Sequence, residues 1–237
     1  MSDLKTALVT GSGRGIGRET AVLLSKRGLN VMICSRTQKE IDSAVKEIKS
    51  SGNDKVIGRK CDVSIGSQVN SLVNEAFGVF GQIDVLINNA GITYVKKLID
   101  TTEGDWDHTL DVNLKGAFLF CKAIVPQMIK KNRGVIINVS SGAGKIGFED
   151  ISAYCASKFG MIGLTESLAK EVGNYDIRVM AICPGEVATK MQENVDARYY
   201  KLNRHRMLHP ATVAEKIADM IFNYNKYRNG ITVDLPN

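Results

Sequence analysis

Tyr154 and Lys158 place a phenol and an ammonium group four residues apart in the stretch Tyr-Cys-Ala-Ser-Lys. On a helix this spacing puts both side chains on one face. A free tyrosine has a pKa of about 10, which is too high for an efficient acid at neutral pH, and a neighbouring ammonium group stabilises the phenolate. The pair alone is a common coincidence, so it indicates proton transfer only where other polar residues reach the same place.

Further polar residues follow the apolar stretches that we expect to be buried strands. Ser141 comes just after the stretch 134–139 and precedes Tyr154 by 13 residues. The others are Asn89 with Ala90 and Gly91, Asn113 on a helix, Pro184 with Gly185, and Thr189. Because open α/β sheets bind ligands at the carboxyl ends of their strands, the sequence predicts that these residues surround one site.

A glycine-rich turn follows the first predicted strand and reads Thr10-Gly11-Ser12-Gly13-Arg14-Gly15-Ile16-Gly17. The literal G-x-G-x-x-G spacing is absent, but the physical requirements are the same. Gly11 allows a tight turn, Gly15 lets the backbone approach a pyrophosphate, and Gly17 lets the next helix pack on the sheet. The N-terminus of that helix offers free N–H groups and the positive end of its dipole to phosphates. The turn therefore predicts a nucleotide site.

The end of the second predicted strand indicates which nucleotide is bound. An NAD site places a carboxylate there to accept a hydrogen bond from the ribose 2′-hydroxyl. Here the chain reads Ser35-Arg36, and no acidic residue occurs before Glu40, which lies in the next predicted helix. Arg36, with Arg14 as a second guanidinium, suits the 2′-phosphate of NADP(H). The alternative is that Arg36 is only a solvated cation at a strand end.

Strand-like and helix-like stretches alternate along the whole chain, which predicts crossover units and a parallel sheet. The expected strands are 5–10, 31–35, 56–60, 83–87, 134–139, 177–182 and 230–235. The expected helices are 16–28, 38–49, 68–80, 103–130, 153–172 and 211–222. No change in composition marks a linker. We therefore expect residues 1–237 to form a single doubly wound Rossmann-type α/β domain, with a seven-stranded parallel sheet and helices on both faces.

The stretch 190–209 is long and has no clear periodicity. Its five basic and two acidic residues contribute +3 to the net charge of +6. Long loops in compact domains often cover active sites, so we interpret this stretch as a substrate loop or lid.

Composition narrows the classes of protein further. The 237 residues include five cysteines without a C-x-x-C pair, which favours a reduced, cytoplasmic protein. We expect no metal site, although His205 and His209 are spaced four residues apart. We also expect no secretory leader and no membrane-spanning run. A nucleic-acid binder would explain a basic chain, but a charge of +6 is modest and no recognition module is present.

Together these motifs resemble the short-chain dehydrogenase/reductase family, in its core branch of roughly 250-residue chains. In that family Tyr154 matches the catalytic acid/base and Ser141 the hydroxyl that orients the carbonyl. Lys158 matches the residue that binds the nicotinamide ribose and lowers the pKa of Tyr154. Asn113 matches the residue that holds a water linking Lys158 to solvent. The resemblance covers essentially the whole chain.

The resemblance also assigns the contacts of an NADP(H) cofactor. The turn 11–17 matches the pyrophosphate loop, Asp62 with Val63 the adenine contact, and Asn89 with Gly91 the loop beside the adenosine ribose. The full set of expected cofactor-binding residues is Gly11, Ser12, Arg14, Gly15, Ile16, Gly17, Ser35, Arg36, Asp62, Val63, Asn89, Ala90, Gly91, Tyr154, Lys158, Pro184, Gly185, Val187 and Thr189. We expect hydride transfer from NADPH to a carbonyl carbon, with Tyr154 donating the proton and Ser141 a hydrogen bond.

Within the family, the chain is most similar to the reductases of 3-oxoacyl thioesters carried on acyl carrier protein or coenzyme A, and to general ketone reductases with the same core. The basic stretch 190–209 and the cluster of Lys130, Lys131 and Arg133 suit the phosphates of such a carrier, or are simply solvated. The ending Leu235-Pro236-Asn237 departs from the glycine-rich ending of that group. A homotetramer is implied, assembled through helices 103–130 and 153–172 and the last strand.

Two alternatives remain for the function. The chain could act on another small ketone, aldehyde or alcohol with NADP, or it could be a catalytically silent NADP-binding sensor. The presence of Asn113, Ser141, Tyr154 and Lys158 together disfavours the sensor, because a protein without catalysis need not keep them.

Overall fold

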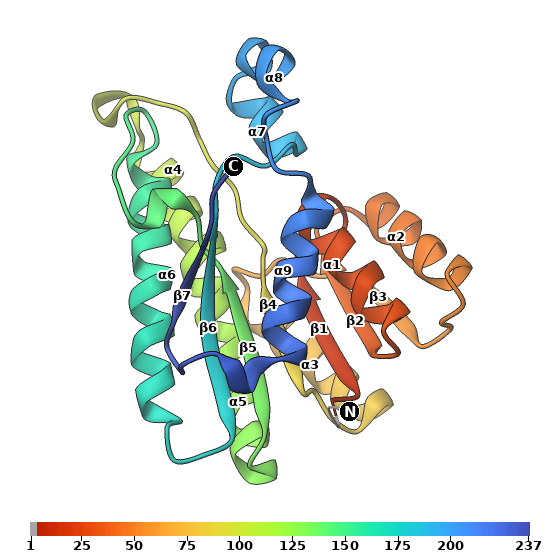
Figure 1. Ribbon diagram of the computed structural model, residues 1–237. Helices are drawn as coiled ribbons and strands as arrows, with labels where there is room; N and C mark the ends of the chain where they lie inside the picture. Colours follow the sequence, from red (N-terminus) through yellow and green to blue (C-terminus); the bar gives the residue numbers. More distant parts are fainter. Residues whose placement is uncertain (1–3) are drawn as a thin grey trace.

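Seven parallel strands form the centre of the molecule in the order β3-β2-β1-β4-β5-β6-β7 (Figure 1). The computed structural model describes residues 4–237. The strands are β1 Thr6–Thr10, β2 Asn30–Ser35, β3 Val56–Lys60, β4 Val85–Asn88, β5 Gly134–Val139, β6 Ile177–Pro184 and β7 Thr232–Leu235. The order reverses between β1 and β4, where the chain crosses from one half of the sheet to the other. The predicted doubly wound Rossmann-type sheet is confirmed.

Helices cover both faces of the sheet because its central strands are apolar on both sides. In β1, Val9 packs against α1 and α9, whereas its neighbour Leu8 faces the layer of α3 and α5. The helices are α1 Gly15–Lys26, α2 Gln38–Ser50, α3 Gly66–Phe80, α4 Glu103–Leu110, α5 Gly116–Lys131, α6 Ser152–Glu171, α7 Lys190–Val195, α8 Ala197–Asn203 and α9 Pro210–Phe222. Figure 1 shows the sheet between these two layers.

The predicted helix 103–130 is helical throughout, but its centre is a π-helical turn, η2 Asp111–Lys115. Asn113 lies in this turn and forms two hydrogen bonds with the backbone of Ile92, at 2.8 and 2.9 Å. Single π turns within α-helices are frequent at functional sites. The turn thereby joins this helix to the loop that follows β4.

The same continuous segment, Glu103–Lys131, is long and apolar enough to cross a membrane by length and composition alone. No run of that kind was expected from the sequence. Half of the apolar window is buried inside the protein, and Phe120, Ile124 and Met128 pack in the core beneath the sheet. Core helices of folded domains have the same composition, so the segment is accounted for as one of the covering layers.

The stretch 190–209 was expected to be an irregular loop. It instead contains the two short helices α7 and α8. Each begins at a side-chain cap: Thr189 Oγ1 accepts from the backbone of Gln192 at 3.4 Å, and Asp196 Oδ1 accepts from that of Tyr199 at 2.8 Å. Helices of six and seven residues are too short to show apolar periodicity. In Figure 1 they stand above the carboxyl end of the sheet.

All five cysteines are free and buried. Among residues 4–237, no group of three or more His, Cys, Asp or Glu side chains lies close enough to hold a metal ion.

Candidate active site

A cavity of about 840 Å³ opens at the carboxyl ends of the strands, on the side where α7 and α8 lie. Its walls come from the glycine-rich turn after β1, the loops after β2, β3, β4, β5 and β6, and the N-terminal parts of α6 and α7. Of the residues expected at the site, all but Ser12, Gly17 and Asn113 line this cavity. The tertiary structure therefore assembles a single site from segments spread over most of the chain.

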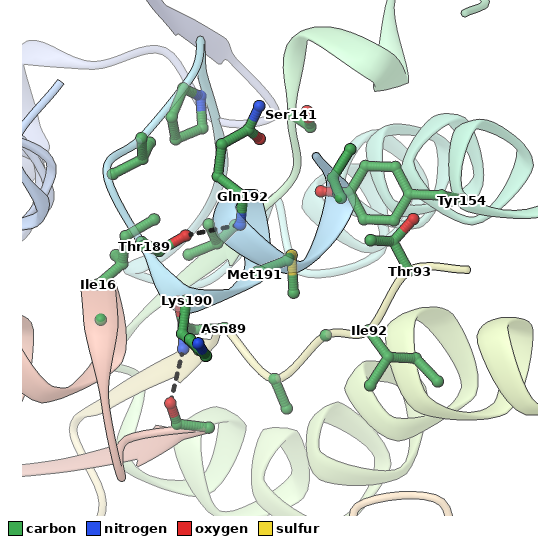
Figure 2. A pocket seen from close by; sticks show the side chains of 18 of the residues that line it. Ile16, Asn89, Ile92, Thr93, Ser141, Tyr154, Thr189, Lys190, Met191 and Gln192 are labelled. Carbon is green, nitrogen blue, oxygen red and sulfur yellow. Dashed lines mark hydrogen bonds between the residues drawn. The ribbon is translucent and has the colours of Figure 1, made fainter. Parts of the chain in front are cut away.

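Tyr154 and Lys158 lie on one face of α6, with the Lys158 Nζ 5.5 Å from the centre of the Tyr154 ring. The ammonium group donates a hydrogen bond to the carbonyl oxygen of Val139 at 2.8 Å, and only 3% of the residue is exposed. Ser141 follows β5, and its Oγ accepts from the backbone of Ala143 at 3.1 Å. Figure 2 shows Ser141 and Tyr154 at the same end of the cavity.

Burial dominates the ionisation of this pair. It raises the pKa of Tyr154 to about 12, although hydrogen bonding with Ser141 acts in the opposite direction. It also lowers the pKa of Lys158 to about 8, because the ammonium form loses its hydration. The Lys158 ammonium group donates to the Val139 carbonyl, and its role in lowering the pKa of Tyr154 stays a prediction. Because burial raises its pKa, Tyr154 is protonated at neutral pH, as a proton donor must be.

Asn113 is completely buried behind the cavity and does not line it. Its amide nitrogen donates to Ser157 Oγ at 3.0 Å, so it connects the π turn to α6 as well as to Ile92. An atom placed on Gly91 as a Cβ would lie 3.4 Å from Asn113 Oδ1 and 3.7 Å from Lys158 Nζ. Asn113 therefore lies close to Lys158, and its role in linking that residue to solvent stays a prediction.

The glycine-rich turn has the geometry that a pyrophosphate requires. Gly11 and Gly15 have positive φ angles of 62° and 58°, which favour glycine. A Cβ on Gly17 would lie 2.5 Å from Asn89 Nδ2, so this glycine serves packing of α1 rather than lining the cavity. The N-cap of α1 is Arg14, which makes no side-chain cap hydrogen bond, so the first N–H groups of the helix remain available. These residues fit the phosphates of a dinucleotide.

Ser12 was expected to bind the cofactor, but it is completely buried outside the cavity. Its hydroxyl donates to the carbonyl of Val9 at 2.9 Å and accepts from the backbone of Cys34 at 3.0 Å. It holds the turn against β2. Thr10, which was not among the expected site residues, has a similar role, since its Oγ1 accepts from the backbone N–H groups of Asn89 and Ala90, both at 3.0 Å.

At the opposite end from Tyr154, both predicted cations line the cavity but have partners. Arg14 Nη1 lies 3.2 Å from Glu40 Oε1, and Arg36 Nη1 lies 3.4 Å from His108 Nε2. Burial raises the pKa of Asp62, but hydrogen bonds from Ser64 and the nearby Arg36 bring it below its usual value. Glu40 lines this end of the cavity too, although its place within a helix did not mark it as a site residue in the sequence.

The wall of the cavity beside α7 carries more acidic than basic side chains, although the stretch 190–209 is basic in composition. Of its five basic residues only Lys190 lines the cavity, together with Met191 and Gln192 of α7. In Figure 2 Gln192 extends toward the end of the cavity where Ser141 lies. The acidic residues here are Glu149, Asp150, Glu186 and Asp196.

The other expected basic cluster lies away from the cavity. Lys131 Nζ donates to Gln82 Oε1 at 2.8 Å, and Arg133 pairs with Asp84 at 3.4 Å. The unusual chain end packs on the cavity wall, where Gly185 donates its N–H to the carbonyl of Leu235 at 2.9 Å.

Residues 5–199 match the family model of the short chain dehydrogenases. The chain belongs to this family. It is 40% identical over 194 residues to the 3-oxoacyl-[acyl-carrier-protein] reductase FabG of Staphylococcus aureus (strain Mu50), covering 81% of this chain and 78% of that protein. It is 37% identical over 236 residues to the FabG reductase of Thermotoga maritima, covering 98% and 96%.

Solved structures agree with this assignment. A variant of actinorhodin polyketide ketoreductase with NADPH superposes on this short-chain dehydrogenase with a TM-score of 0.93 at 31% identity, over 99% of this chain and 96% of that one. Levodione reductase superposes with a TM-score of 0.92 at 28% identity, over 98% and 95%.

Proposed function

We propose that this short-chain dehydrogenase reduces a ketone carbonyl with NADPH. The observation that carries the proposal is the grouping of Tyr154, Ser141 and the buried Lys158 in one cavity with the glycine-rich turn. A nicotinamide cofactor, when bound, supplies the hydride. Tyr154, protonated at neutral pH, donates a proton to the carbonyl oxygen as negative charge develops there, and Ser141 donates a hydrogen bond to the same oxygen.

Lys158 holds the cofactor's nicotinamide ribose in this proposal, and its position beside Tyr154 makes it the group through which the spent proton is replaced. Asn113 positions it by joining α6 to the loop after β4. The choice of NADPH is supported by Arg14 and Arg36 at the far end of the cavity and by the NADPH in the related ketoreductase. The residues around the glycine-rich turn would hold its pyrophosphate.

A 3-oxoacyl thioester, carried on acyl carrier protein or coenzyme A, is the first substrate we propose, because the FabG relatives are named for that reaction. A second candidate is another small ketone without negative charge. It is favoured by the four carboxylates that line the substrate wall, where Lys190 is the single basic residue of 190–209. An anionic carrier arm would have to pass these carboxylates, whereas a neutral ketone would not be repelled.

We further propose a cytoplasmic homotetramer in which α7 and α8 cover the bound substrate. Apolar side chains on the outer surfaces of α4, α5 and α6 support the assembly: Trp106, Phe118 and Phe159 are 38%, 45% and 46% exposed. Exposed aromatic side chains on neighbouring helices are typical of surfaces that another protein copy covers.

Initial rates of NADPH and NADH oxidation with acetoacetyl-CoA, and with a panel of neutral ketones, test the reaction and the substrate class. Tyr154→Phe should lower kcat at least about 100-fold and leave NADPH binding nearly unchanged, since it removes only the proton donor. Tyr224→Phe is the matched control, because Tyr224 donates its hydroxyl to Asp176 at 3.2 Å and does not line the cavity. Full turnover in Tyr154→Phe would overturn the mechanism, and absence of turnover with every ketone would overturn the function.

A further inference from the structure

Glu40 brings a carboxylate to the end of the cavity that Arg14 and Arg36, the proposed partners of a 2′-phosphate, also line. It occupies the first turn of α2, and its side chain is 30% exposed. A Cβ placed on Gly13 would lie 2.8 Å from Glu40 Oε2 and 2.9 Å from Ser35 Oγ. Both oxygens therefore face the same small space above Gly13, beside the end of β2. Gly13, Ser35 and Glu40 all line the cavity.

This is the position where an NAD site places a carboxylate to accept the ribose 2′-hydroxyl. In such sites the acid ends the second strand, whereas here the strand ends in Ser35 and the carboxylate arrives from the adjacent helix. The other oxygen of Glu40 is 3.2 Å from Arg14 Nη1. One of the two cations available for a 2′-phosphate is thus already paired with an anion.

We propose that Glu40 sets the cofactor preference of this protein: it accepts the ribose 2′-hydroxyl of NAD(H) and repels the 2′-phosphate of NADP(H), so that both cofactors bind. The inference rests on the proposed function, since it concerns the same cavity. Arg14 and Arg36 favour the phosphate, while Glu40 opposes it directly and by holding Arg14. A 2′-phosphate carries nearly two negative charges at neutral pH, so a carboxylate that faces the same space opposes its binding.

Glu40→Gln removes the charge and retains the shape of the side chain. Its NADPH dissociation constant should fall about tenfold and its NADH dissociation constant should rise a few fold, because an amide neither repels the phosphate nor accepts as strongly. Glu40→Ala should tighten NADPH to a similar degree and weaken NADH further, since no acceptor remains. The ratio of the NADPH and NADH dissociation constants therefore measures how strongly Glu40 sets the cofactor preference.

Glu47→Gln is the matched control. Glu47 lies on the same helix and accepts from Arg18 Nε at 2.7 Å, so this substitution removes the same charge from the same kind of ion pair. It does not line the cavity, and both cofactors should bind it as they bind the unaltered protein.

Isothermal titration of each protein with NADPH, NADH, 2′,5′-ADP and 5′-AMP measures the preference without catalysis. The two adenosine nucleotides carry only the part of the cofactor that reaches Glu40, so they should show the same change in ratio. A change below twofold in Glu40→Gln, an equal change in Glu47→Gln, or weaker NADPH binding in Glu40→Gln would overturn the inference alone. Failure of the unaltered protein to bind either cofactor would overturn the proposed function and this inference with it.

Discussion

Replacing Lys158 with methionine should stabilise the fold at neutral pH while it abolishes turnover. Burial lowers the pKa of this lysine from 10.5 to about 8, so its ammonium form is less favourable in the fold than in the unfolded chain. That difference corresponds to about 3 kcal/mol. Methionine has a similar length and no charge, so the variant escapes this penalty.

The substitution also removes a hydrogen bond. Lys158 Nζ donates to the carbonyl oxygen of Val139 at 2.8 Å, and leaving that acceptor without its partner costs about 1 kcal/mol. The variant should therefore unfold with a free energy about 2 kcal/mol higher at pH 7. For a chain of this length, that is a rise in Tm of about 4 to 8 °C.

The pH dependence of the stability difference shows whether the buried charge of Lys158 causes it. Below pH 8 the lysine is protonated in the folded and unfolded states, so the whole penalty is present. As pH rises from about 8 toward 10.5, the folded protein releases this proton before the unfolded chain does, and the unaltered protein gains stability. The advantage of Lys158→Met should shrink across that range and reverse to a deficit of about 1 kcal/mol above it.

Urea unfolding of both proteins at pH 6.5, 7.5, 9 and 10 measures this difference directly, at values chosen on either side of the pKa of about 8. Lys170→Met, at an exposed lysine on the same helix α6, controls for loss of a surface charge and should show no such pH dependence. If Lys158→Met is less stable than the unaltered protein at pH 7, or if the difference is the same at every pH, then burial of the charge is not what lowers the pKa.

Two further changes probe the cofactor turn and the cover of the cavity. Gly17→Ala should weaken NADPH binding at least about tenfold, because the turn must move to admit the methyl group. Gly78→Ala, whose Cβ meets nothing within 4 Å, is the control and should bind NADPH normally and be slightly more stable. Equal NADPH titration curves for the two variants would contradict this prediction. Tyr199→Phe removes the hydroxyl that donates to Glu186 at 3.1 Å, so trypsin should cut α8 faster. The KM for the substrate should rise while kcat changes little. An unchanged cleavage rate would show that this contact does not hold α8 in place.

The predictable part of the fold came from strong local signals. The stretch 134–139 is β5 residue for residue, because a strand buried on both faces is largely apolar and therefore recognisable in sequence. The expected strand 56–60 is β3, although it lies at the sheet edge and its last two residues are exposed and charged. The boundaries that moved did so by a few residues at helix and strand ends. The stretch 190–209 gave no signal, since α7 and α8 begin at polar caps and are too short for an apolar face to repeat.

The sequence by itself determined the family, the parallel sheet and the position of Tyr154 and Lys158 on one helix face, because those features depend on local spacing and on the side chains along one segment. Only the tertiary structure decided what the electrostatic environment of each group would be. Burial raises the pKa of Tyr154 to about 12, and the first turn of α2 places Glu40 beside Gly13 and Ser35. Both effects depend on distances between segments far apart in the chain, and residue spacing does not encode such distances.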